Sequence, residues 1–272
     1  MTKREQHAEE LKEILSQFPK RDVSIELYAY ITANSNLPGP RGNLELAAAF
    51  EDVIFNQTNV DAVRDFWNLC VTMTNLSAEE APVGNPKELI VFCGARGIGA
   101  IGAAHPEYQL EALHRLEELS QDTRWRLREG VAMAIQKMIV EDSIIVQEEL
   151  DRWIGCGNWL VLRGAVAGIA EPKLLVKADF AKWSIEAHRK VFDRIINSSD
   201  RKSGEFRILR KALGYSLSVV VKANPDEGFH LLGELIEKDD SDLKWIIKEN
   251  LKKKRLTTTF PDEVELLKKK LG

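Results

Sequence analysis

The stretch that decides the fold is residues 124–139, which read RWRLREGVAMAIQKMI. On a helical wheel its aliphatic residues fall within one arc of about 100°, which is the pattern of an amphipathic helix. The buried arc holds Leu127, Val131, Ala134, Ile135 and Met138, and the opposite side holds Trp125, Arg128, Ala132 and Gln136. The segment therefore predicts a helix that buries one face and presents an aromatic ring and a cation on the other.

Segments of this design recur along the chain. A basic residue, then a small residue at +2, an aliphatic one at +3 and a small one at +4 recur at Arg128, Arg163 and Arg210; the five aligned segments begin at Arg96, Arg128, Arg163, Arg210 and Lys248. Their spacings are 32, 35, 47 and 38 residues. The pattern resembles the HEAT-repeat superfamily over roughly residues 86–255, and bacterial HEAT-repeat proteins of unassigned function are similar in layout. The resemblance implies an armadillo-like fold, a right-handed α-α superhelix of about five to six helix pairs.

Helical periodicity also dominates the rest of the sequence, so we predict an all-α chain. Helices are expected over 4–18, 23–33, 44–55, 60–74 and 86–103, then in pairs over 106–120 with 124–139, 143–154 with 159–170, 179–198 with 205–223 and 226–238 with 242–255, and last over 261–271. Asn43 is the expected N-cap after a Pro/Gly-rich loop. Residues 1–85 form an N-terminal helical segment, continuous with the repeats of residues 86–272.

Composition narrows the classes of function. Hydrophobic residues make up 44% and charged residues 29%, which is typical of a folded protein. Lys and Arg number 38 against 42 Asp and Glu, so the net charge of −4 disfavours a generic nucleic-acid binder. Cys70, Cys93 and Cys156 form no CxxC pair, which excludes a disulfide framework and a zinc site. The longest apolar run, 89–104, is interrupted by Arg96, and no targeting signal is visible, so we expect a cytoplasmic protein that spans no membrane.

The second helix of each pair lines the concave surface in a solenoid, which defines a candidate binding groove. Its aromatic and basic residues are Trp125, Arg128, Trp159, Arg163, Phe206, Arg210, Trp245 and Lys248. Trp125, Trp159 and Trp245 should each keep part of the ring open to solvent on one common face. The core arcs predict burial of Leu127, Val131, Ile135, Leu162, Val166, Leu209, Leu213 and Ile247. The alternative is structural: the cations pair with acids such as Asp122 and Asp242, and the aromatics pack between repeats.

Charge is unevenly distributed along the chain. Residues 1–200 hold 22 basic and 30 acidic side chains, whereas residues 201–272 hold 16 basic and 12 acidic ones. Lys244, Lys248, Lys252 and Arg255 are predicted on one side of helix 242–255, beside Arg207, Arg210 and Phe206. We expect an acidic partner to dock there and not on residues 1–120.

Motifs for catalysis are weak. Gly97, Gly99 and Gly102 match GxGxxG after an apolar run that could be a strand, but a helical segment follows, and small residues at this spacing also suit close helix packing. The five histidines lie apart, and His114 and His188 are expected at the surface. The 38–42 loop, with Arg41, is expected to be a plain connector, with anion binding as the alternative. We predict no catalytic residue, metal or cofactor, and a non-enzyme is favoured although the question stays open.

Two functions of different classes follow. The first is a non-enzymatic interaction scaffold that binds a protein or peptide in the aromatic and basic groove, through the residues above together with Arg207 and Lys252. The second is a DNA-repair-like nucleic-acid binder, because the groove looks similar to that of the HEAT-like alkylpurine DNA glycosylases; Trp125 and Glu129, one turn apart, are the nearest equivalent of that family's tryptophan and acid. A HEAT-type lyase for a bilin-like chromophore has no residue that argues for it. A continuous positive stripe favours nucleic acid, and a mixed groove favours a peptide.

Overall fold

The computed structural model describes residues 1–57, 62–156 and 158–271. Helices make up its regular structure, and no strand occurs in these three ranges, which confirms the all-α prediction. The chain forms two compact units, Met1–Val146 and Gln147–Gly272.

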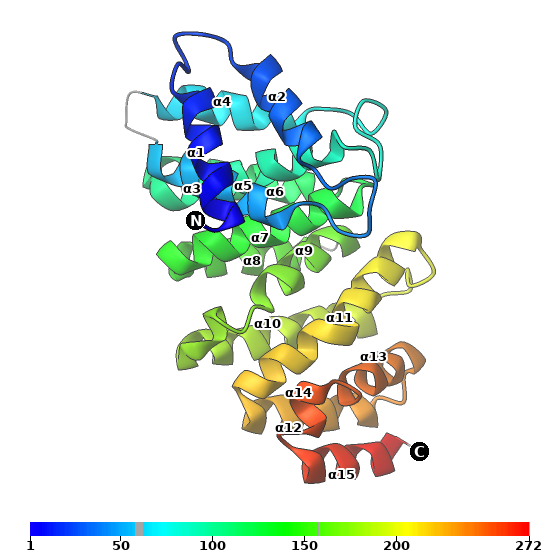
Figure 1. Ribbon diagram of the computed structural model, residues 1–272. Helices are drawn as coiled ribbons and strands as arrows, with labels where there is room; N and C mark the ends of the chain where they lie inside the picture. The colour runs from blue at the N-terminus through cyan, green and yellow to red at the C-terminus, as the bar shows by residue number, and fades with distance from the viewer. Residues whose placement is uncertain (58–61, 157, 272) are drawn as a thin grey trace. The chain divides into compact units, whose positions relative to one another are not determined.

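The first unit contains seven α-helices and the beginning of an eighth among its described residues (Figure 1). They are α1 (Lys3–Leu15), α2 (Ser24–Ala33), α3 (Leu44–Gln57), α4 (Val63–Thr74), α5 (Glu88–Ala104), α6 (Gln109–Leu119), α7 (Trp125–Glu141) and α8 (Ser143–Gly155), with a 3₁₀ turn, η1, at Pro106–Tyr108. Asn43 precedes α3 as predicted, and its side chain accepts a hydrogen bond from the Leu46 N–H at 3.0 Å.

The second unit continues with helices of similar length. They are α9 (Trp159–Ile169), α10 (Ala178–Ile196), α11 (Gly204–Ala223), α12 (Pro225–Glu237), α13 (Ser241–Leu251), the short α14 (Lys254–Thr257) and α15 (Pro261–Leu271), with a 3₁₀ turn, η2, at Leu174–Val176. The predicted helix over 242–255 is wrong at its end. The backbone leaves the helical conformation at Lys253, so Lys252 caps α13, and Arg255 belongs to α14.

The predicted core residues are buried. Leu127, Val131, Ile135, Leu162, Val166, Leu209, Leu213 and Ile247 each have 0% of their surface exposed. Seven of them lie in α7, α9 and α11, three in α7 and two in each of the others, where the apolar arc repeats every three or four residues, and Ile247 lies in α13. The wheel therefore identified the inward side of these helices correctly.

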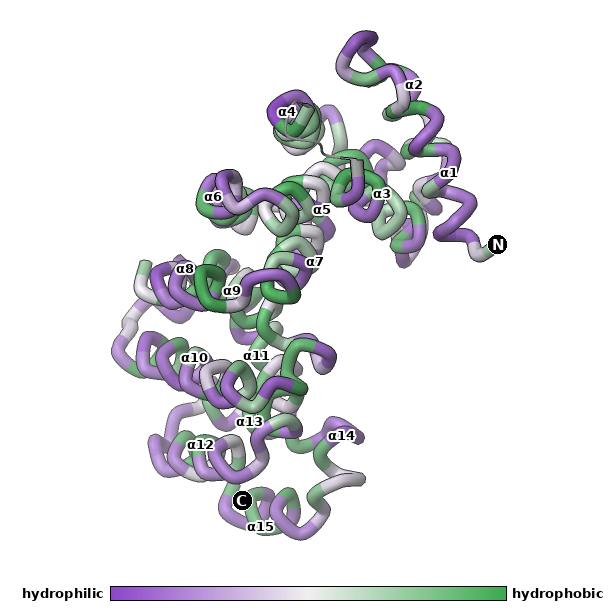
Figure 2. The backbone as a smooth tube through the Cα atoms, turned by 90° about the vertical axis from the view of Figure 1, so that its left-hand side faces the viewer, coloured by the Kyte–Doolittle hydropathy of each residue, from purple (hydrophilic) through white to green (hydrophobic). Residues whose placement is uncertain are grey.

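Helix α5 is the centre of the first unit. It packs against α2, α3, α4, α6 and α7, and every residue from Glu88 to Gly102 is buried. Figure 2 shows the contrast in hydropathy between the apolar α5 and the hydrophilic α1. The GxGxxG motif lies inside this helix, as the predicted helix over 86–103 indicated, and no strand precedes the glycines among the described residues. A Cβ on Gly99 would lie 2.5 Å from the Ala134 Cβ of α7, and one on Gly102 would lie 2.6 Å from the Ala112 Cβ of α6. The glycines thus permit close helix packing.

Helix α11 is the centre of the second unit, as α5 is of the first, and it contacts α9, α10, α12 and α13. His188 of α10 lies in this core with 0% exposure, so the prediction of a surface histidine is wrong. Its Nδ1 is 2.8 Å from the Ser184 carbonyl oxygen and its Nε2 is 3.0 Å from the Ser216 hydroxyl. Burial lowers the pKa of His188 to about 4, so the ring is neutral near pH 7. His114 of α6 is exposed as predicted.

Replacing Gly99 with alanine should destabilise the protein. The new methyl group would collide with backbone as well as side-chain atoms of Ala134, so α5 and α7 must separate, at a cost of about 1 to 3 kcal/mol in the free energy of unfolding. Gly233→Ala is the control, because a Cβ at Gly233 of α12 meets no atom within 4 Å and alanine favours a helix by up to about 1 kcal/mol. Urea unfolding of both variants measures the difference, and equal stabilities would contradict the packing argument.

Stability should also depend on His188. Its folded-state pKa of about 4 lies below the ordinary 6.5, so the unfolded chain binds a proton that the folded chain excludes between these pH values. The contribution is fully present above about pH 6.5 and is lost progressively toward pH 4, by about 3 kcal/mol, with no further loss below. His188→Gln should remove this slope from the pH profile of the unfolding free energy, whereas His114→Gln should retain it.

Candidate partner-binding surface

The predicted groove residues divide between the two units. Trp125 and Arg128 lie on α7 of the first unit. The other eight lie in the second unit: Trp159, Arg163, Phe206, Arg207, Arg210, Trp245, Lys248 and Lys252. Within the second unit α11 contacts both α9 and α13, so the structure brings most of these residues onto neighbouring helices.

An arginine and a tryptophan form the centre of the surface between α11 and α13. The Arg210 guanidinium carbon lies 4.3 Å from the ring centroid of Trp245, within cation–π range. Arg210 Nη1 is also 3.1 Å from Asp242 Oδ1, an ion pair of the kind that the structural alternative for these cations predicted. Trp245 is half-buried, so the predicted partial exposure of this ring is confirmed.

A glycine of α11 makes room for the indole. A Cβ on Gly214 would lie 3.2 Å from Trp245 Cζ3 and 3.4 Å from Cη2, so the ring lies flush against the α11 backbone one turn after Arg210. The ring is held between a glycine and a guanidinium and has little freedom to rotate. Such rigid, partly exposed aromatic and arginine side chains are typical of binding hot spots.

Asp240 fixes the N-terminus of α13 beside this centre. Its Oδ1 accepts hydrogen bonds from the N–H groups of Asp242 at 2.9 Å and Leu243 at 3.1 Å, and its Oδ2 lies 2.6 Å from Arg201 Nη1. Burial raises the pKa of Asp240, but these hydrogen bonds and the Arg201 charge outweigh it, and the pKa lies below its usual range. The carboxylate stays ionised near neutral pH and holds α13 in place.

Two cations beside the centre are exposed and have no carboxylate partner among the described residues. Arg207, one turn before Arg210, donates only to the backbone carbonyls of Lys202 and Ser203. Lys248 follows Trp245 by one turn on α13. Together with Arg210 and Trp245 they form what we call the α11/α13 face.

The predicted basic patch is largely neutralised. Lys252 lies 2.6 Å from Glu249, Lys244 pairs with Asp239, and Arg201 and Arg210 pair with Asp240 and Asp242. Because α13 ends at Leu251, Lys244, Lys248, Lys252 and Arg255 do not share one helical face as predicted. The surface carries charges of both signs with a small local excess of positive charge.

Trp159 and Phe206 are packing residues, contrary to the expectation that they line an open groove. Trp159 is 7% exposed and Phe206 is 1% exposed, and their rings meet edge to face with centroids 5.4 Å apart. The Trp159 Nε1–H donates to the Asp200 carbonyl oxygen at 2.9 Å. Arg163 is also buried, at 8% exposure. The contact of α9 with α11 therefore covers the two aromatic residues, and the buried Arg163 does not line an open groove either.

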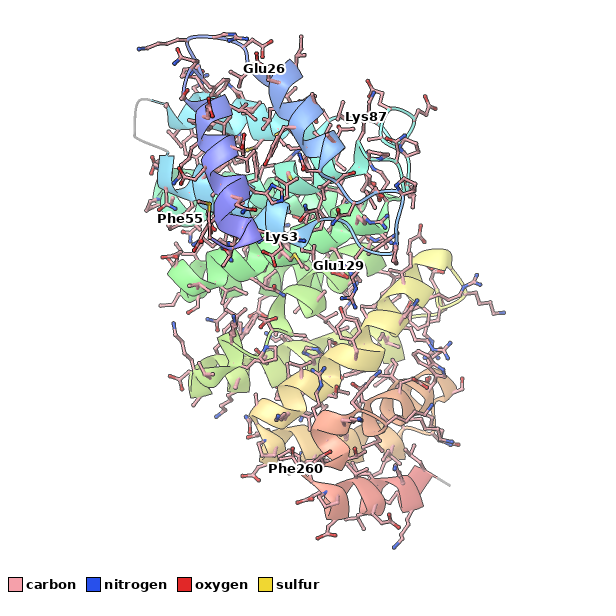
Figure 3. The ribbon with its side chains drawn as sticks, viewed as in Figure 1. Lys3, Glu26, Phe55, Lys87, Glu129 and Phe260 are labelled. Atoms are coloured by element: carbon pink, nitrogen blue, oxygen red, sulfur yellow. The ribbon has the colours of Figure 1, made fainter. Side chains whose placement is uncertain are left out.

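Trp125 is the exposed tryptophan of the first unit, with 43% of its surface open, as predicted. Its ring lies over Arg126, whose guanidinium carbon is 4.4 Å from the ring centroid. Arg126 in turn binds Glu88 Oε2 at 2.7 Å and the Gly39 carbonyl oxygen at 2.9 Å. Glu129 lies one turn further along α7 (Figure 3).

Buried arginines near Trp125 fix two loops, a role that sequence reasoning missed. Arg126 holds the 38–42 loop through the Gly39 carbonyl, which supports the plain connector over the anion site; Arg41 points to the surface. Arg124, 2% exposed, donates to the carbonyls of Leu76 and Ser77 at 2.8 and 3.1 Å. Arg128 is buried too and binds the Asp122 and Thr123 carbonyls, so it does not present its charge to solvent as predicted.

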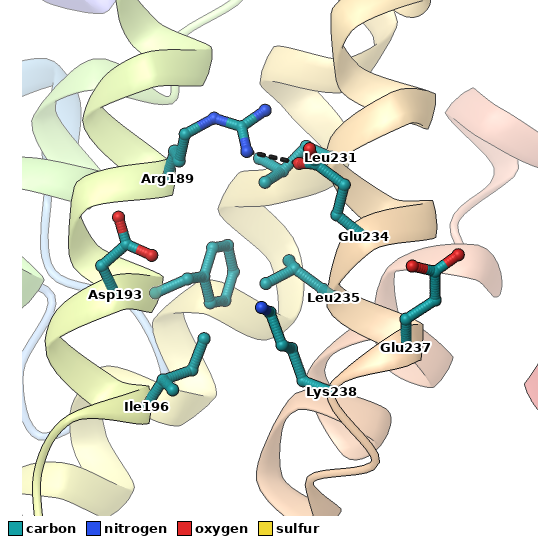
Figure 4. A pocket seen from close by; sticks show the side chains of 9 residues that line it. Arg189, Asp193, Ile196, Leu231, Glu234, Leu235, Glu237 and Lys238 are labelled. Atoms are coloured by element: carbon teal, nitrogen blue, oxygen red, sulfur yellow. Dashed lines mark hydrogen bonds and ion pairs between the residues drawn. The ribbon is translucent and has the colours of Figure 1, made fainter.

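A separate groove of about 450 Å³ lies between α10 and α12 (Figure 4). Phe192, Leu231 and Leu235 form its floor, and Arg189 and Glu234 pair with each other across the rim. Since the rim carries both signs and its arginine is already bound, the groove offers no concentrated charge for an ionic ligand. Within the described ranges no group of three or more His, Cys, Asp or Glu side chains is arranged for a metal ion.

The buried cysteines offer no reactive thiol, and the described helices offer no membrane-spanning segment. Burial raises the pKa of Cys70, and it raises that of Cys93 to about 12, so both thiols are protonated and unreactive near pH 7; Cys156 is exposed. None of the described helices combines the length and apolar content that crossing a bilayer requires.

Trp125 should dominate the quenching of fluorescence by a polar solute. It is 43% exposed, whereas Trp153 of α8 is completely buried. Trp125→Phe is therefore expected to lower the acrylamide-accessible fraction of the emission, and Trp153→Phe is expected to raise it. Stern–Volmer plots of both variants measure this, and an unchanged accessible fraction in Trp125→Phe would show that the ring is covered.

Comparison with known proteins gives little. No family model matches the chain, and no curated protein matches it either. The crystal structure of an engineered protein is similar at 17% sequence identity, covering 95% of this chain and 100% of that chain. The TM-score of that match is 0.35, which is too low to support an argument about fold or function.

Proposed function

We propose that the protein is a HEAT-like α-solenoid that acts as a non-enzymatic interaction protein and binds an acidic segment of a protein partner on the α11/α13 face. The observation that carries the proposal is the stack of Arg210 on the half-buried Trp245, with its guanidinium 4.3 Å from the ring. The recurrence of basic and small residues at Arg128, Arg163 and Arg210, in the second helices of three successive pairs, supports the solenoid.

The face is organised before any partner arrives. Asp242 holds the Arg210 guanidinium, Gly214 seats the Trp245 ring, and Asp240 caps α13. Binding then immobilises few side chains on this protein, which lowers the entropic cost of association. An aliphatic side chain of the partner would cover the open part of the indole, and its carboxylates would meet Arg207 and Lys248.

The charge pattern favours a peptide over nucleic acid. A protein that follows a phosphate backbone needs several cations free to displace counterions, since each contact contributes to affinity and to its salt dependence. Here Arg201, Arg210, Lys244 and Lys252 already have carboxylate partners, and within the α11/α13 face as defined above Arg207 and Lys248 are the two cations without one among the described residues. Two cations beside an aromatic ring suit a short acidic and apolar segment.

Reversing the two unpaired charges tests the proposal. Arg207→Glu combined with Lys248→Glu should weaken binding of a fluorescein-labelled peptide of repeated Glu-Glu-Leu by about tenfold or more, and flatten the salt dependence of its Kd. Both side chains are exposed, so helix content and unfolding midpoint should stay at wild-type values. Fluorescence anisotropy between low and high salt is the measurement.

The control is Lys268→Glu with Lys270→Glu, two exposed lysines of α15 that change the net charge equally. This control should bind the peptide as wild type does. A duplex DNA oligonucleotide is the second probe. If wild type binds DNA with a steep salt slope and ignores the peptide, the nucleic-acid reading replaces the peptide one; equal peptide affinity in both double variants would show that the α11/α13 face is not the site.

A further inference from the structure

Helix α13 carries a fully buried asparagine whose amide group bonds to the backbone of α11. Asn250 has 0% exposure. Its Oδ1 accepts a hydrogen bond from the Ser218 N–H at 2.7 Å, and its Nδ2 donates to the Leu213 carbonyl oxygen at 2.8 Å. Nδ2 also donates to the Ile246 carbonyl oxygen within α13 at 2.8 Å.

These bonds join the two helices at their main chains. In a regular α-helix the N–H of residue 218 donates to the carbonyl of residue 214, and the carbonyl of residue 213 accepts from residue 217. Asn250 offers an acceptor and a donor to an N–H and a carbonyl on neighbouring turns of α11, and both of its amide hydrogens find acceptors. A slide of α13 by one residue along α11 would take the buried Asn250 amide oxygen away from the Ser218 N–H and one of its amide hydrogens away from the Leu213 carbonyl, at a considerable cost in free energy.

The amide lies along the same contact as the Arg210–Trp245 stack. Arg210, Gly214 and Ser218 follow one another at one-turn intervals on α11. Asp242, Trp245 and Asn250 of α13 meet them in that order, through an ion pair, the ring contact and the amide bond. The register that satisfies Asn250 therefore also places the indole against Gly214 and beside Arg210.

We infer that Asn250 is the positioning residue of the α11/α13 face: it fixes the register of α13 on α11 and thereby sets the Arg210–Trp245 stack. A buried polar group that accepts only one alignment is a known means of fixing helix register. The inference concerns the site of the proposed function, and the expected change in peptide affinity rests on that function. The expected change in the position of the Trp245 indole does not depend on it.

Asn250→Leu tests the inference, because leucine has nearly the same size and can bury its side chain without restricting the register. With 5-fluorotryptophan incorporated, the ¹⁹F resonance of Trp245, assigned by Trp245→Phe, should shift or split as the indole samples more than one position. The Ser218 amide resonance should move, and the Kd for the Glu-Glu-Leu peptide should rise by about tenfold. Circular dichroism should still report the helix content of wild type.

Asn197→Leu is the matched control. Asn197 lies in the same unit, is exposed, and its amide donates only to the Asp193 carbonyl within its own helix end. The Trp245 resonance of the Asn197→Leu variant should coincide with that of wild type. A purely space-filling role for Asn250 predicts the same unchanged resonance in Asn250→Leu, and that result would overturn the inference.

A second variant covers the case in which Asn250→Leu does not fold. Asn250→Asp keeps the acceptor for the Ser218 N–H but places a carboxylate oxygen where the amide donated to the Leu213 and Ile246 carbonyl oxygens, so the ¹⁹F resonance of Trp245 should also move from its wild-type position. A wild-type resonance in this variant also overturns the inference. If wild type fails to bind the peptide while Asn250→Leu still displaces the Trp245 resonance, the proposed function is wrong and the positioning role stands.

Discussion

The close contact of α5 with α7 is the constraint on which the first unit depends. Helix α5 contacts five other helices, and they can pack closely against its backbone only where its own side chains are small. Gly99 and Gly102 meet this need against Ala134 and Ala112. Once the helices are this close, the N-terminal end of α7 lies near the loop before α3 and the first residue of α5, and the buried Arg126–Glu88 pair joins α7 to α5 at 2.7 Å. Close packing brings α5 and α7 together, and the Arg126–Glu88 ion pair then fixes their relative orientation.

The second unit obtains order from polar groups at the contact of α11 with α13. Asp240 and Asp242 act on both a helix end and a neighbouring arginine, so one short acidic segment caps α13 and neutralises Arg201 and Arg210. Local neutralisation explains why a stretch rich in Lys and Arg does not produce a strongly positive surface. The net charge of a segment is a sum over the sequence, whereas a partner meets only the charges that have not already found an opposite charge.

Helix existence and the inward arc were predictable because both depend on neighbours within two turns. Leu127, Val131 and Ile135 are buried as the wheel indicated. The same wheel placed Trp159 and Phe206 on an open side, and there it failed, since α9 and α11 pack these two rings against each other. The prediction that His188 is exposed was wrong for a similar reason, because its hydroxyl partner, Ser216, is 28 residues away in the sequence. A wheel reports which side of a helix is apolar, but a second neighbour can cover the other side as well.

The end of α13 was predicted wrongly and the Glu88–Arg126 ion pair was not predicted at all, for different physical reasons. Helix α13 stops at Leu251 although lysines after it are good helix formers, because Leu256 of α14 turns inward and is fully buried. Tertiary burial outweighs local propensity here. The Glu88–Arg126 pair spans 38 residues and has no local signature; one acid directly before an apolar run is the only trace in the sequence. The contact of Arg210 with Asp242 was within reach of sequence reasoning because the prediction placed successive second helices side by side, as α11 and α13 are.

The complete burial of α5 has a consequence for how this sequence can change over generations. From Glu88 to Gly102 no position faces water, so substitution there is limited by volume at almost every residue. A half-exposed helix such as α15 can accept polar exchanges on its outer side, whereas α5 can change only together with the helices around it. Related chains would therefore diverge slowly in this segment and drift at their outer helices, and a comparison of sequences anchored on α5 would be the most reliable means of finding distant relatives.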